Sequence, residues 1–369
     1  MSQENKKSLP GNTLWFTRCA GNGEGGVPTA SGIAYNLGWL QEEFAPDQIR
    51  LRALQEADAA EFRHHHYDHG LETLIREGGN LFAIPAKAQG AKTRLIGLTW
   101  IEEAQSIIVR ADSDIRTPAD LKGKRVALPA YAEQDIAENK RGKTITRHSS
   151  LHGYKGALDS VGLTLDDVQL VEVGQDERSP TGHRYGGWQA SFNALLDGRV
   201  DAAYVKGAAA QDGARAQGLV VGIDLDKLPE KRFRVNNGTP RPVTVHEYLL
   251  ENHYDIVVRF LAQTLRAAEW AKDNLDGVHK ILQAETGGTA EGVAAAYRDG
   301  FHLSLAPDLS DERLALFRQQ KNFLLTYGIL DRDFNFDAWV DRRPLQDAHK
   351  LLQEILAKEA ADKSQKLAA

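Results

Sequence analysis

Short β-rich apolar runs alternate with amphipathic segments before residue 243, a pattern typical of parallel α/β units. The expected strands are 13–17, 48–54, 94–98, 106–109, 125–128, 168–173, 202–205 and 219–223. The expected helices between them are 31–43, 70–77, 149–161 and 192–197. Thr117-Pro-Ala-Asp-Leu-Lys-Gly123 predicts a helix turn that ends at the glycine and leads into a strand.

The character of the chain changes after residue 243. An apolar pattern with a helical period runs over residues 245–274 and returns over 313–327, so we expect the C-terminal part to be helical. Residues 357–369 are small and charged and are expected to fray. Residues 174–187 are polar and rich in Gly and Pro, which predicts a mobile loop.

Composition excludes several classes of protein. With 369 residues, 42% hydrophobic and 26% charged, the chain is expected to form two globular lobes. A net charge of −6 argues against a nucleic-acid partner, and one cysteine excludes an intramolecular disulfide or a cysteine-rich metal centre. No apolar run reaches the roughly 20 residues of a membrane span. The N-terminus lacks the run of roughly seven apolar residues of a secretory signal, so we expect a cytoplasmic location.

Three motifs carry a family resemblance. They are Arg94-Leu-Ile-Gly-Leu-Thr-Trp leading into Gln105-Ser-Ile-Ile-Val-Arg, then Ile115-Arg-Thr-Pro-Ala-Asp-Leu-Lys-Gly-Lys-Arg-Val-Ala-Leu-Pro, and Phe192-Asn-Ala-Leu-Leu-Asp-Gly-Arg-Val-Asp-Ala-Ala-Tyr-Val. Together they resemble the type II periplasmic binding-protein superfamily, in its nitrate, sulfonate and taurine branch. The resemblance implies a two-lobed α/β fold with an inter-lobe cleft. Lobe I would comprise residues 11–108 and 240–369, lobe II residues 109–239, and residues 1–10 a flexible tail.

Within this superfamily the chain is similar to cytoplasmic sulfinate desulfinases. Their catalytic cysteine follows the first strand, and a histidine and an arginine ten residues apart precede a Gly-Gly pair. Here Cys19 follows the expected strand 13–17, His66 precedes Arg76 by ten residues, and Gly78 and Gly79 come next. The resemblance implies hydrolysis of a carbon–sulfur bond without cofactor or metal, with a small organic sulfinate or sulfonate anion as the partner and with no membrane span. We expect the protein to be a monomer or weak dimer.

The chemistry of these residues supports that interpretation. A lone cysteine is usually a small buried apolar residue, but Cys19 is expected at the edge of the sheet where α/β folds place ligands. Arg18 and the glycine-rich stretch that follows would favour an accessible thiolate there. The guanidinium of Arg76 suits a planar oxyanion, and Gly78 and Gly79 let backbone N–H groups approach the same oxygens. The alternative is a solvated arginine at a helix end.

The histidine run His64-His65-His66-Tyr67-Asp68-His69 leaves three hypotheses open. His66 is the candidate ligand and proton partner of the cysteine, because imidazole exchanges a proton near neutral pH. His65 and His69 stand four residues apart and could bind a metal if the segment is helical; pyrimidine synthases of thiamine biosynthesis share the fold and use a pocket histidine. The third possibility is an exposed polar segment.

Two function classes remain. The first is a cytoplasmic sulfinate hydrolase with Cys19, His66 and Arg76 as catalytic residues, and with Thr17, Gly78, Gly79 and Trp188 contacting the substrate, the last as a lid residue. The second is a solute-binding protein of an importer for sulfonate-, nitrate- or taurine-like anions, which needs no cysteine but does need export. A cytoplasmic anion sensor is a weaker third option.

Overall fold

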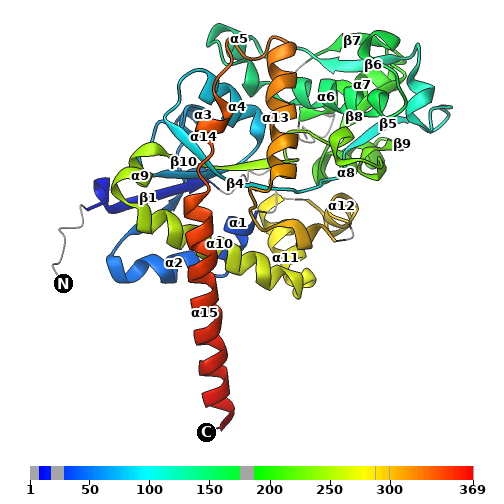
Figure 1. The fold of residues 1–369 in the computed structure, drawn as a ribbon. Coiled ribbons are helices and arrows are strands. Elements are labelled where there is room, and N and C mark those ends of the chain that lie inside the picture. The colour runs from blue at the N-terminus through cyan, green and yellow to red at the C-terminus, as the bar shows by residue number, and fades with distance from the viewer. Residues whose placement is uncertain (1–7, 18–28, 175–186, 287, 299, 369) are drawn as a thin grey trace.

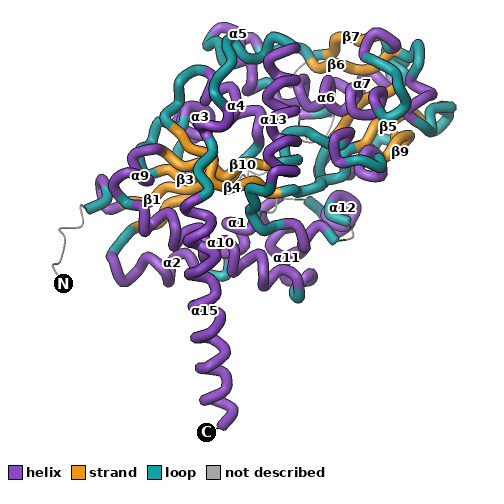
Figure 2. The backbone as a smooth tube through the Cα atoms, viewed as in Figure 1, coloured by secondary structure: helices purple, strands orange, loops and turns teal. Residues whose placement is uncertain are grey.

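Two β-sheets, each covered by helices, make up the body of the protein in the computed structural model (Figure 1). The structure describes residues 8–17, 29–174, 187–286, 288–298 and 300–368. Figure 2 shows the strands gathered in two separate regions, with helices around each of them. This is the two-lobed α/β architecture that the sequence predicts.

The first sheet has five strands in the order β2-β1-β3-β10-β4. Their bounds are β1 Thr13–Thr17, β2 Arg50–Ala53, β3 Leu74–Glu77, β4 Thr93–Thr99 and β10 Arg241–His246. Strand β1 is parallel to β2 and β3, whereas β10 runs antiparallel to β3 and β4. Parallel pairing brings the C-terminal ends of β1 and β3 to the same edge of this sheet.

The second sheet also has five strands, in the order β7-β6-β8-β5-β9. Their bounds are β5 Ser106–Arg110, β6 Arg125–Pro129, β7 Gln169–Val173, β8 Ala202–Val205 and β9 Leu219–Asp224. Strand β6 is parallel to β7 and β8, and β5 is antiparallel to β8 and β9. The first strand after each crossover runs antiparallel to both of its neighbours in the sheet. These strands are β5 in the second sheet and β10 in the first.

The chain crosses between the sheets twice, at residues 100–105 and again between β9 and β10. The division expected between residues 108 and 109 falls inside β5, whose residues pair with β8 and β9 of the second sheet. The first change of sheet therefore precedes Ser106.

Helices cover both sheets, and those after β10 form the largest helical group (Figure 1). The helices are α1 Ala30–Asn36, α2 Trp39–Phe44, α3 Ala59–Asp68, α4 Asn80–Ala88, α5 Glu133–Ala137, α6 Ile145–Asp159, α7 Gln189–Leu196, α8 Ala208–Ala216, α9 Glu247–Asn252, α10 Tyr254–Lys272, α11 Leu275–Thr286, α12 Ala290–Ala296, α13 Asp311–Thr326, α14 Phe336–Trp339 and α15 Arg343–Ala368. Each lobe has its own apolar core. None of the helices in the described ranges is long and apolar enough to cross a bilayer.

The helix expected over residues 70–77 is wrong. Residues Leu74–Glu77 form β3, which lies between β1 and β10 and is buried along its whole length. A strand covered on both faces shows no alternation of polar and apolar residues, so a run as short as Leu74-Ile75 cannot be told from a helical segment by its periodicity.

The fraying expected over residues 357–369 is also wrong for the residues described. Helix α15 continues to Ala368 and extends away from the body of the protein (Figure 1). Its Leu352 is buried, and Glu359 pairs with Arg266 of α10, so contacts with α10 extend the packed part of the helix. Alanine, lysine and glutamate then carry it further, because all three are strong helix formers. Of the expected loop at 174–187, residues 175–186 lie outside the described residues.

Helices α6 and α13 meet through an aromatic stack that predicts a pH dependence of stability. The ring of His152 lies 4.1 Å from that of Phe323 with an interplanar angle of 9°, and burial lowers the pKa of His152 to about 3. The folded state therefore keeps this imidazole neutral. Its contribution to stability is complete above the unfolded-state pKa of about 6.5 and is lost as the pH falls from there toward 3.

We expect His152→Phe to keep the stack and remove this titration. The loss of unfolding free energy between pH 7 and pH 5 should shrink by about 2 kcal/mol. Urea unfolding at both pH values, followed by tryptophan fluorescence, measures this difference. The exposed His349 is the control, since the same substitution there should leave the loss unchanged. Equal pH dependence of wild type and His152→Phe would contradict the expectation.

Candidate functional site

The ends of β1 and β3 bring the first candidate residues together. Thr17 is the last residue of β1 and pairs in register with Arg76 of β3. Both side chains are fully buried. Carboxyl ends of parallel strands are the usual place for ligand sites in α/β folds. Cys19 follows Thr17 by two residues and lies outside the described residues.

Arg76 is held by hydrogen bonds from two of its nitrogens. Its Nε donates to the carbonyl oxygen of His66 at 2.9 Å, and its Nη2 donates to Nε2 of His66 at 3.3 Å and to the carbonyl oxygen of Gly79 at 3.0 Å. These acceptors are neutral, so they orient the guanidinium and keep its charge. The fork geometry of arginine makes such an arrangement specific.

The contact with Arg76 determines the tautomer of His66, which lies on α3. A guanidinium only donates hydrogen bonds, so Nε2 of His66 must accept and the ring proton sits on Nδ1. That Nδ1 lies 3.4 Å from the hydroxyl oxygen of Thr17. Burial lowers the pKa of His66 well below its usual value, and the charge of Arg76 lowers it further. His66 is therefore a neutral ring at physiological pH.

Two glycines make room for this arrangement. A Cβ atom on Gly78 would lie 2.7 Å from Nη2 of Arg76, and one on Gly79 would lie 2.3 Å from Oδ1 of Asn237. The N–H of Gly78 donates to the carbonyl oxygen of Pro242. The N–H of Gly79 forms no hydrogen bond with any described residue, which leaves it as a donor beside Arg76. Sequence reasoning expected both glycines to offer donors; Gly78 does not.

The second crossover caps the helix that follows these glycines. Asn237 accepts the N–H of Leu81 on its Oδ1 at 3.0 Å and the N–H of Asn80 on its carbonyl oxygen at 2.9 Å. The side chain of Asn80 in turn donates to the carbonyl oxygens of Asn236 and Pro240. Sequence reasoning did not single out Asn237, although Asn-Asn-Gly at 236–238 is a turn signal that marks this segment.

Three buried charged residues connect the two crossovers. Arg241, at the start of β10, donates to Glu103 at 2.5 Å, and Lys206 lies 3.7 Å from the same carboxylate. All three side chains are at most 9% exposed. The charge of Arg241 also contributes to the lowered pKa of His66. Buried pairs of this kind hold elements in register rather than add much net stability.

The carboxyl group of Glu77 accepts a hydrogen bond from helix α1. Its Oε2 accepts a hydrogen bond from the hydroxyl of Ser31 at 2.5 Å, in the first turn of α1. Burial raises the pKa of Glu77, while the bond from Ser31 lowers it. Thr29 caps the same helix by accepting the N–H of Gly32, so Thr29-Ala-Ser-Gly32 opens the first helix in this structure.

The remaining candidate residues have other contacts. His64 pairs with Asp68 at 2.6 Å and is more than half exposed, whereas His69 is buried with Nε2 3.1 Å from the hydroxyl of Thr244. Among the four histidines, His66 is the one whose hydrogen bonds to Arg76 are described. Trp188 is 4% exposed and packs against Tyr204 in the core of the second lobe. Within the described ranges, no three His, Asp or Glu side chains gather as metal ligands.

Curated relatives of this chain are sulfinate desulfinases. It is 27% identical over 305 residues to the 2'-hydroxybiphenyl-2-sulfinate desulfinases of Rhodococcus erythropolis and Rhodococcus qingshengii, with 74% of this chain and 80% of each relative covered.

Solved structures share the whole fold. A mutant of the desulfinase DSZB in complex with biphenyl-2-sulfinic acid superposes with a TM-score of 0.69 at 23% identity, over 92% of this chain and 99% of that one. The periplasmic aliphatic sulphonate-binding protein SsuA of Escherichia coli gives 0.62 at 16% identity, over 89% and 91%. The sulfonate-binding protein SsuA from Methylobacillus flagellatus gives 0.69 at 15% identity, over 94% and 96%.

These neighbours confirm the predicted fold class and the predicted resemblance to desulfinases and sulfonate-binding proteins. The family described as NMT1/THI5 like matches residues 79–276, which is more than half of the chain. The protein therefore belongs to the NMT1/THI5-like family.

Proposed function

We propose that this protein is a cytoplasmic sulfinate desulfinase-like hydrolase that needs no cofactor. It would convert R–SO2⁻ and water into R–H and hydrogen sulfite, breaking the carbon–sulfur bond. The observation that carries the proposal is the triple contact of Arg76 with the His66 ring, the His66 carbonyl and Gly79, at the strand edge where Thr17 leads toward Cys19. The similarity to curated sulfinate desulfinases supports it.

In this proposal the sulfinate oxygens are held by Arg76 and by the N–H of Gly79. The guanidinium supplies a positive charge in a buried setting, where an anion gains most from it. The neutral ring of His66 keeps Arg76 in place and leaves its charge intact. Thr17 fixes the other side of that ring.

Cys19 is the reacting group of the proposal. A thiolate can attack the sulfur while the carbon–sulfur bond breaks, and the departing carbon keeps the electron pair of that bond and takes a proton to give R–H. Water then hydrolyses the thiosulfonate-like Cys–S–SO2⁻ intermediate to hydrogen sulfite and the free thiol. Alternatively the thiol can deliver a proton to the departing carbon, while water supplies the oxygen that sulfite gains. In both routes a closed site keeps bulk water away from the carbon that takes the proton.

A solute-binding protein for sulfonate-like anions is the second candidate function. The specific observation in its favour is the TM-score of 0.69 to the sulfonate-binding protein of Methylobacillus flagellatus, equal to that of the desulfinase complex. Arg76 and Gly79 would serve a bound anion equally well in this role. Chemistry at Cys19 is what separates the two candidates.

We expect Cys19→Ser to abolish sulfite release while ligand binding persists. The hydroxyl of serine has no accessible anionic form near pH 7, so turnover should fall by about 10³-fold or more. Sulfite production and calorimetric binding of biphenyl-2-sulfinate, measured for wild type and variant, check this. Wild-type binding without any sulfite release would favour the solute-binding candidate. Turnover of the variant at the wild-type rate would show that Cys19 is not the reacting group.

We expect Arg76→Lys to weaken sulfinate binding by about 1–3 kcal/mol, the usual contribution of a hydrogen bond to a charged group. Lysine keeps the charge but cannot contact His66 and Gly79 at the same time as the ligand. Calorimetric titration with biphenyl-2-sulfinate measures the change. Arg110→Lys is the control, since that side chain is 42% exposed and on the second sheet. Equal affinities for wild type and Arg76→Lys would argue that Arg76 does not touch the anion.

A further inference from the structure

A tight turn in the second crossover carries Asn237 at its tip. Asn236 and Thr239 exchange both of their backbone hydrogen bonds, each at 3.0 Å, so Asn237 and Gly238 form a two-residue tip. Asn-Gly is a pair that such turns favour. Asn237 is partly exposed, whereas Asn236 and Gly238 on either side of it are buried. The turn therefore presents the side chain of Asn237 to solvent.

The orientation of the Asn237 amide is determined by its hydrogen bond to helix α4. A backbone N–H only donates, so the atom that accepts from Leu81 at 3.0 Å is the oxygen Oδ1, and the other end of the amide is the NH2 group. The carbonyl oxygen of Asn237 accepts from Asn80 at 2.9 Å and holds the turn against the same helix. The NH2 group donates to no residue in the described ranges. Its nitrogen Nδ2 is not one of the buried polar atoms that lack a partner, so solvent reaches it.

This NH2 group lies beside Gly79. A Cβ atom on Gly79 would be 2.6 Å from Nδ2 of Asn237, so the nitrogen is within roughly 4 Å of the Cα atom of the glycine, given a bond of about 1.5 Å. Gly79 has a φ of −55°, which any residue adopts, so the missing side chain makes room for the amide rather than for a special backbone. The guanidinium of Arg76 donates to the carbonyl oxygen of the same glycine. The N–H of Gly79 and the NH2 of Asn237 are therefore neighbouring donors near Arg76.

The turn is held in place from its own base and tip. At the base, Nδ2 of Asn236 donates to the hydroxyl of Tyr204 at 2.9 Å. At the tip, a Cβ atom on Gly238 would lie 2.7 Å from Nη2 of Arg241 and 3.0 Å from Oε1 of Glu103. The backbone of the tip therefore packs closely against this buried ion pair.

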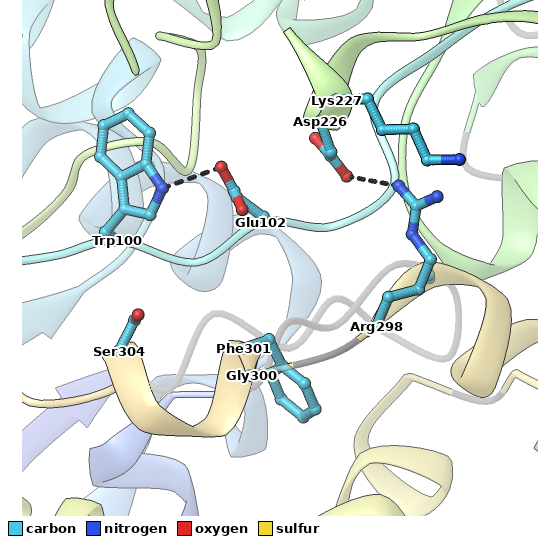
Figure 3. Close-up of a pocket in the computed structure, with 9 residues that line it drawn as sticks. Trp100, Glu102, Asp226, Lys227, Arg298, Gly300, Phe301 and Ser304 are labelled. Carbon is cyan, nitrogen blue, oxygen red and sulfur yellow. Dashed lines mark hydrogen bonds and ion pairs between the residues drawn. The ribbon is translucent and has the colours of Figure 1, made fainter. Parts of the chain in front are cut away.

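Further contacts fix the two crossovers relative to each other. Arg234 of the second crossover pairs with Glu102 of the first at 2.7 Å. Figure 3 shows that Glu102 also accepts from the indole N–H of Trp100, and that Asp226 of the second crossover pairs with Arg298. A donor held on such a support binds an anion without first having to be ordered.

We propose that Asn237 is a further anion-binding residue, whose NH2 group donates to an oxygen of the sulfinate held by Arg76 and Gly79. This role rests on the proposed function, which places the anion there. A hydrogen bond to an ionised oxygen is stronger than one between neutral groups, so one amide has a measurable effect on affinity. The donor serves a hydrolase and a solute-binding protein alike, since both first bind the anion. The second crossover then contributes to the site directly, besides capping α4.

The test is calorimetric titration of the full-length protein with sodium biphenyl-2-sulfinate, for wild type, Asn237→Asp and Asn237→Ala. Aspartate keeps the oxygen that caps α4 but replaces the NH2 donor with an anionic oxygen. The free energy of unfolding should therefore be retained, while affinity falls by about tenfold or more. Alanine removes the donor without adding charge, and affinity should fall by about tenfold. Urea unfolding of each variant measures the loss of the cap separately.

Asn335 provides the matched control. Its Oδ1 likewise accepts an N–H at the start of a helix, that of Ala338 at 3.0 Å, and the residue is exposed. Asn335→Asp and Asn335→Ala should bind the sulfinate like wild type.

Equal affinity of wild type and Asn237→Ala overturns the proposal, because a loss confined to Asn237→Asp is then repulsion of the anion by the new charge. Equal affinity of wild type and Asn237→Asp overturns it as well. Both results leave the proposed function standing, since wild type binds the sulfinate. A wild-type protein that binds no sulfinate contradicts the proposed function itself, and the role of Asn237 with it.

Discussion

The burial of one guanidinium, that of Arg76, is the constraint on which the candidate site depends. A charge removed from water has to be surrounded by hydrogen-bond acceptors, and here they come from α3 and from the turn after β3. This requirement explains the neutral state of His66, because a protonated ring could not accept from Arg76. It also explains Gly78, where any side chain would meet the guanidinium.

The same region is tied to the two crossovers that connect the lobes. Asn237 and Arg241 belong to the second crossover and the strand it leads into, and Glu103 belongs to the first crossover. Asn237 caps the helix that begins beside Gly79, so a change in the crossover alters the position of that N–H.

The chain belongs to the NMT1/THI5-like family, and both an enzyme and a binding protein are among the solved structures that share its fold. A scaffold that closes around an anion serves both, since capture and catalysis each begin with an oriented, partly dehydrated oxyanion. What distinguishes them is a reacting group, and the fold cannot supply that information. The reacting group proposed for this chain is Cys19, which comes two residues after Thr17, the last residue of β1.

The sequence by itself determined the alternation of strands and helices, the two lobes, the helical C-terminal part, and the spacing of His66, Arg76 and the two glycines that the resemblance made meaningful. These are local or near-local features, so periodicity and motif spacing reveal them. Only the tertiary structure decided that Leu74–Glu77 is a strand, that Trp188 is buried, and that Glu103 meets Arg241. Each of these features depends on contacts with segments that are distant along the chain. A local sequence pattern does not show which distant segment will pack against it.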